Sequence, residues 1–78
     1  MNKLDEIFSR AQACLDGKIP YSSLGPAERH LCALPIHQAA QYVLKGKDRG
    51  ERNWRLMKAP ASIRDAIKAE AERLYALR

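Results

Sequence analysis

The sequence has few of the residues that stabilise small secreted domains, with two cysteines, one phenylalanine and one tryptophan in 78 residues. Cys14 and Cys32 are too few for a disulfide framework, and we interpret both as small buried residues in a reducing compartment. The first six residues include two acids and a lysine where a secretory leader would be apolar, and no apolar run approaches the length of a membrane span. We therefore expect a soluble, cytoplasmic protein.

Motifs for catalysis are also missing. The four glycines are dispersed singly, which excludes a glycine-rich phosphate loop. The serines lack a glycine elbow, and neither histidine has a neighbouring acid that the sequence identifies as its orienting partner. A chain of this length is also short for a protein that shelters a substrate cleft. We predict that the protein is not an enzyme and has no catalytic residue or cofactor.

A zinc site was the next possibility, because Cys14, His30, Cys32 and His37 carry suitable ligand atoms. Their spacing argues against it. His30 and Cys32 are two residues apart, so their side chains diverge by about 200° on a helix. The chain has no CxxC or HxxxH pair that could chelate a metal. We therefore predict no metal ligand, with Cys32 buried and both histidines near the surface.

The alternation of apolar and polar residues that a half-buried strand needs is absent, whereas apolar residues recur at helical spacing. The fold class that follows is all-α, a compact bundle of four to five short helices in a single domain, residues 1–78. The first helix is predicted to begin at an Asn2 cap and to end at Gly17. Its predicted apolar face consists of Leu4, Ile7, Phe8, Ala11 and Leu15.

Prolines and glycines set the boundaries of the next predicted elements. Residues 18–25 are expected to form a loop or one short turn. Pro26 suits the first turn of a second helix, which Pro35 interrupts. Pro35 then opens a third helix, which ends at Gly46.

Pro60 precedes the last predicted helix, which runs nearly to Arg78. Ser62 and Asp65 resemble a capping box at its start. Two ion pairs are predicted along its surface, Lys68 with Glu72 and Glu70 with Arg73. Its predicted apolar face consists of Ile63, Ile67, Ala71 and Leu74.

The most informative segment is residues 45–58, which hold six of the fourteen cationic side chains around the single tryptophan. Against Asp48 and Glu51 these cations give the segment a net charge of +4, out of +5 for the whole sequence. We predict that residues 45–52 form an exposed turn, and that Glu51 to Lys58 form a short helix presenting Trp54 and Met57 to the core. The alternative for Trp54 is an exposed platform on which a partner stacks. Arg64 and Lys68 of the last helix can extend the basic surface. The predicted partner-binding residues are Lys45, Lys47, Arg49, Arg52, Arg55, Lys58, Arg64 and Lys68.

From Arg49 to Arg78, a charged turn leads through Trp54 and Ala59-Pro60 into a helix closing with Glu70, Arg73, Leu74, Tyr75 and Arg78. This part of the chain resembles small helical proteins encoded in phage and prophage accessory regions. The resemblance implies a binder that redirects or blocks a host machine, as anti-CRISPR and anti-restriction proteins do, or a small regulator of phage DNA. The basic charge departs from the acidic inhibitors that mimic DNA.

Three hypotheses follow from these features. The leading one is a non-catalytic interaction protein that binds and occludes an acidic protein or nucleoprotein through residues 45–58. The second is direct binding of DNA or RNA through the same residues. A helix-turn-helix is disfavoured because the gap from Leu44 to Glu51 looks too long and too charged for its turn. The third is a structural homodimer that buries an apolar helix face.

Overall fold

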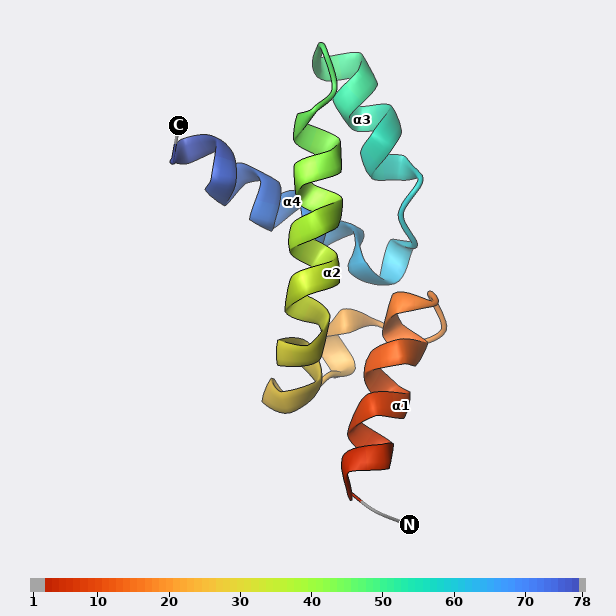
Figure 1. Cartoon of the computed structure of the whole chain (residues 1–78). Coiled ribbons are helices and arrows are strands. Elements are labelled where there is room, and N and C mark those ends of the chain that lie inside the picture. Colours follow the sequence, from red (N-terminus) through yellow and green to blue (C-terminus); the bar gives the residue numbers. More distant parts are fainter. Residues whose placement is uncertain (1–2, 78) are drawn as a thin grey trace.

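The computed structural model describes residues 3–77 and confirms the all-α prediction, with four α-helices and no strand in that range (Figure 1). The Asn2 cap and Arg78 lie outside the described residues. The elements are α1 (Lys3–Leu15), a single 3₁₀ turn η1 (Tyr21–Ser23), α2 (Pro26–Leu44), α3 (Arg49–Met57) and α4 (Ala61–Ala76).

Helix α2 is the centre of the bundle, with α1 beside its N-terminal half, α3 beside its C-terminal half and α4 crossing it (Figure 1). Much of the core is small, so the helices can approach closely. On α4 the predicted apolar face is largely confirmed, because Ile63, Ile67 and Ala71 are buried and Leu74 packs at the edge. The residues that α1 and α2 bury are Ala11, Cys14, Cys32, Ile36, Ala40 and Val43.

The predicted break at Pro35 is wrong, because α2 continues through this residue without interruption. A proline inside a helix costs about 3 kcal/mol, since it removes one backbone hydrogen bond and crowds the preceding turn. Packing offsets this cost here. Cys32 lies before the proline and Ile36 after it, and both belong to one buried stripe that continues to Val43. Breaking the helix at Pro35 would split that stripe.

Helix α1 ends as predicted, at a left-handed Gly17 with φ of 84°. The Lys18 N–H donates to the Ala13 carbonyl and the Gly17 N–H to the Cys14 carbonyl, which is the Schellman arrangement. The predicted apolar face of α1 is partly wrong, because Leu4 and Phe8 are more than half exposed. The first turns of α1 extend beyond the start of α2 (Figure 1).

The predicted capping box at Ser62 and Asp65 is also wrong. Pro60 occupies the N-cap position of α4, and no side chain caps this helix. The Ser62 hydroxyl instead donates to the Cys14 carbonyl at 2.7 Å, at the C-terminal end of α1. This bond ties the start of α4 to the end of α1, two segments far apart in the sequence.

Of the two predicted ion pairs on α4, one forms. Glu70 accepts from Arg73 Nε at 2.7 Å and also lies 2.7 Å from His37 Nδ1 on α2, a partner that the sequence did not reveal. Arg73 first, and His37 second, hold the pKa of the Glu70 carboxyl down at about 2. Lys68 and Glu72 form no ion pair.

The low pKa of Glu70 predicts a specific loss of stability in acid. The carboxylate stabilises the folded state above the pKa that it has in the unfolded chain, and this contribution is lost as the pH falls through about 4.5 toward about 2. Thermal unfolding of the wild type and of Glu70→Gln should therefore differ most near neutral pH and converge in acid. Glu72→Gln removes an equally charged group that is in no ion pair, and serves as the control. Parallel curves for the two variants would contradict the role of Glu70.

Candidate functional site

The start of α3 is fixed by two acids in the basic segment. Asp48 is the N-cap, and its Oδ1 accepts from the Glu51 N–H at 2.8 Å. Glu51 Oε2 accepts in turn from the Lys47 N–H at 3.1 Å. These bonds start the helix at Arg49, so the predicted exposed turn is wrong for residues 49–52. Only residues 45–48 connect α2 to α3.

The connection between α2 and α3 is therefore short, and the predicted long gap is wrong. Helix α3 nevertheless runs back beside the C-terminal half of α2 (Figure 1). This is a hairpin of two helices, whereas a DNA-reading helix-turn-helix places its helices across one another.

Arg55 is one of two predicted contact residues whose guanidinium groups are used within the fold. It donates to the Tyr42 carbonyl at 2.8 Å, pairs with Glu51 at 3.0 Å and stacks over the Tyr42 ring at 4.5 Å. Arg64 donates to the carbonyls of Met57 and Ala59, at 3.2 and 2.8 Å, and so caps the end of α3. Together they fasten α3 to α2 and α4.

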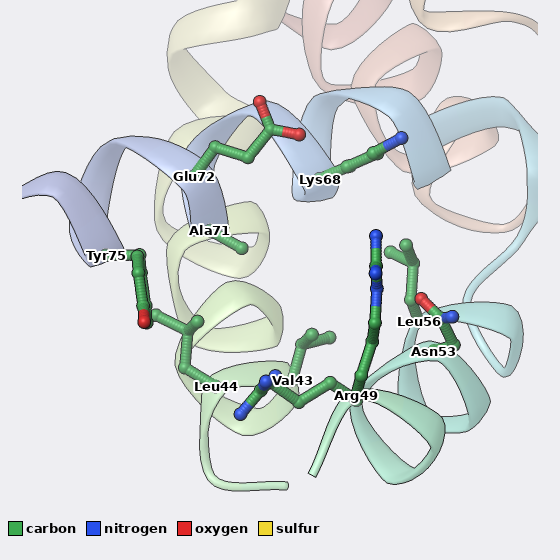
Figure 2. Close-up of a pocket in the computed structure, with 10 residues that line it drawn as sticks. Val43, Leu44, Arg49, Asn53, Leu56, Lys68, Ala71, Glu72 and Tyr75 are labelled. Atoms are coloured by element: carbon green, nitrogen blue, oxygen red, sulfur yellow. The ribbon is translucent and has the colours of Figure 1, made fainter.

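Three other predicted contact residues, Arg49, Arg52 and Lys68, meet at one groove of about 430 Å³ between α2, α3 and α4 (Figure 2). Among the described residues none of the three forms an ion pair. Figure 2 shows Lys68 on one wall and Leu56 on the other. The rest of the lining consists of Val43, Leu44, Asn53, Ala71, Glu72 and Tyr75.

A second hollow lies next to the groove, and Leu44 lines both. It is formed by Gln41, Leu44, Lys45 and Leu74, so a fourth predicted cation lies along the same path. Lys47 lies exposed in the turn beyond it. Each hollow thus combines leucine side chains with at least one cation in its lining.

The prediction that Trp54 and Met57 face the core is wrong. Trp54 is 59% exposed and Met57 60% exposed. The inward positions belong to Arg52, Arg55 and Leu56, because the methylene stems of arginines can cover apolar surface as a larger aromatic would. The Lys58 ammonium lies 3.8 Å from the centre of the Trp54 ring.

The described residues were also compared with the requirements of a metal site, a reactive thiol and a membrane-spanning helix. Across residues 3–77 no three histidine, cysteine or acidic side chains gather as a metal would require. Cys14 and Cys32 are free and fully buried, and burial raises the pKa of both thiols, which keeps them protonated. Within the same residues, no helix is both long and apolar enough to span a membrane.

In comparisons with known proteins, no family model, curated protein or solved structure matches this chain.

Proposed function

We propose that the protein is a non-catalytic interaction module that docks α3 and its neighbouring groove on an acidic protein surface and acts by occlusion. The exposed surface of α3 supports this function. It carries Trp54 and Met57 on its outer side and the unpaired cations Arg49 and Arg52 toward the groove. Tryptophan, methionine and arginine are the residue types enriched at protein interfaces, and tryptophan and arginine dominate their hot spots. Such blocking action would suit the phage accessory proteins that the second half of the chain resembles.

The outward position of Trp54 carries this proposal. A large aromatic side chain on a helix of only nine residues is usually the anchor of that helix in the core. Here α3 is held instead by Leu56 and by the hydrogen bonds of Arg55, which leaves Trp54 free of a packing role. The flanking ammonium of Lys58 gives the exposed ring a positive neighbour, which favours an acidic partner over an apolar one.

Binding should depend on both features without a change in folding. We expect Arg49→Glu with Arg52→Glu to reduce capture of the partner from a nuclease-treated host lysate by about tenfold or more. Trp54→Ala should weaken capture by a similar factor, and the free energy of unfolding should stay within about 0.5 kcal/mol of the wild type. Arg49 is the first residue of α3, where an acid interacts favourably with the helix dipole, and Glu at position 52 keeps the methylene that packs on Gly46.

Lys3→Glu with Lys18→Glu is the matched control, because it changes the net charge equally at exposed positions of α1 and the following turn. The proposal would be contradicted if capture survives in the α3 variants. It would also be contradicted if capture falls in this control as much as it does in them. Loss of capture on nuclease treatment of the wild type would instead indicate nucleic-acid binding. That function further predicts a mobility shift with duplex DNA that weakens steeply as salt increases.

A further inference from the structure

The shape of the groove restricts what can fill it. The main hollow of about 430 Å³ and its neighbour of about 390 Å³ both have Leu44 in their lining, so they are adjacent. A compact small molecule would fill one of them and leave the other empty. An extended stretch of polypeptide can occupy both, with one apolar side chain in each hollow.

The chemistry of the lining sets the composition of that stretch. Val43, Leu44 and Leu56 offer an apolar floor, while Arg49, Arg52 and Lys68 supply positive charge at the edge. A bound segment therefore needs apolar side chains on one side and carboxylates beside them. Glu72 is the single acid in the lining, and it stands on the opposite side of Lys68 from the α3 wall (Figure 2).

Other occupants fit the groove less well. In a symmetric dimer with groove facing groove, a second copy of this chain would bring the same cations against Arg49, Arg52 and Lys68, and like charges at close range are unfavourable. A phosphate backbone would satisfy the cations and leave Val43 and Leu56 facing charged oxygens.

We infer that this groove is the receptor for a partner segment that combines apolar side chains with adjacent carboxylates. The inference rests on the proposed function and adds to it the place and the composition of the contact. Carboxylates of the segment pair with Arg52 and Lys68, which lie on different helices, and the apolar side chains enter between α2, α3 and α4. The guanidinium of Arg52 can hold a carboxylate through two parallel hydrogen bonds.

The test uses the full-length protein labelled with ¹⁵N and an amidated hexapeptide of the order glutamate, glutamate, leucine, phenylalanine, glutamate, glutamate. Nuclear magnetic resonance titration to millimolar peptide should shift the amide signals of groove residues, and Arg52→Gln with Lys68→Gln should weaken the affinity by about tenfold or more. Two comparison peptides separate the two components of the ligand. One replaces every glutamate with glutamine, and the other replaces leucine and phenylalanine with glycine.

Both comparison peptides should bind more weakly than the acidic apolar one, by about tenfold or more each. The inference is overturned if the acidic apolar peptide causes no shift at millimolar concentration, if the shifted signals lie away from the groove, or if either comparison peptide binds equally well. Lys3→Gln with Lys18→Gln controls for the loss of two charges and should leave the affinity unchanged. Capture of a partner that depends on Trp54 while the peptide fails to bind would remove the groove and leave the proposed function standing.

Discussion

Ile67→Ala is expected to destabilise the protein so strongly that much of it unfolds well below the melting temperature of the wild type. Ile67 lies in the middle of α4, is 0% exposed and is among the largest fully buried side chains. Truncating a buried isoleucine to alanine costs about 2–5 kcal/mol, through lost transfer free energy and the cavity left behind. A domain of this size has a total stability of roughly 5 kcal/mol, so one substitution can remove most of it.

Thermal unfolding followed by circular dichroism measures this effect. Each kcal/mol lowers the melting temperature of such a domain by about 4–8 °C, so the expected decrease is on the order of 10–30 °C. Leu34→Ala is the matched control, because Leu34 is also a large aliphatic residue inside a helix but is 63% exposed. Its melting temperature should stay close to that of the wild type. Equal losses from the two variants would show that α4 does not cross α2 through Ile67.

Local sequence rules predicted the fold class well because they concern neighbours along the chain. The helical recurrence of Ile63, Ile67 and Ala71 located α4 and its buried face. Gly17 was located as the end of α1 because a left-handed residue there is a local requirement that glycine meets at little cost. In both cases the tertiary structure agrees with the local preference.

The same rules failed where packing between helices overrides the local preference. The sequence predicts a helix boundary at Pro35, because it does not show that Cys32 and Ile36 on its two sides face one common core. Trp54 was assigned to the core on size and apolarity, whereas the stems of Arg52 and Arg55 take the inward positions. The spacing of Arg52 with Leu56, four residues apart, is the one sequence feature that could indicate an inward face with arginine stems. The same spacing is equally typical of a solvent-exposed face.

The groove could be predicted only in part. Charge clustering identified Arg49, Arg52 and Lys68 as candidates. It did not separate them from Arg55 and Arg64, whose side chains hold α3 in place. That separation depends on where the Tyr42 and Ala59 carbonyls lie relative to each guanidinium, which no local pattern records.

Gly46 and Gly50, four residues apart on either side of the start of α3, should respond to alanine with opposite effects on stability. Gly46 is buried and has no positive φ, so the chain needs glycine there for close approach of the backbone and not for a left-handed conformation. A Cβ at position 46 would lie 2.9 Å from the backbone nitrogen of Arg52. At Gly50 a Cβ would meet only Asp48 Oδ1, at 3.4 Å, which is close to ordinary contact.

Gly46→Ala should therefore destabilise the protein by about 1–3 kcal/mol, because the contact is with backbone and α3 must move to relieve it. Gly50→Ala should be neutral or stabilise it by up to about 1 kcal/mol, since alanine restricts the unfolded chain and favours the helix. Thermal unfolding measures both changes. Because Arg52 is the residue displaced, Gly46→Ala should also weaken binding of the acidic apolar peptide, while Gly50→Ala should not. If Gly46→Ala has the same melting temperature and peptide affinity as Gly50→Ala, the close contact between Gly46 and the Arg52 backbone is not present in solution. Helix α3 would then not be held in the position where it forms one wall of the groove.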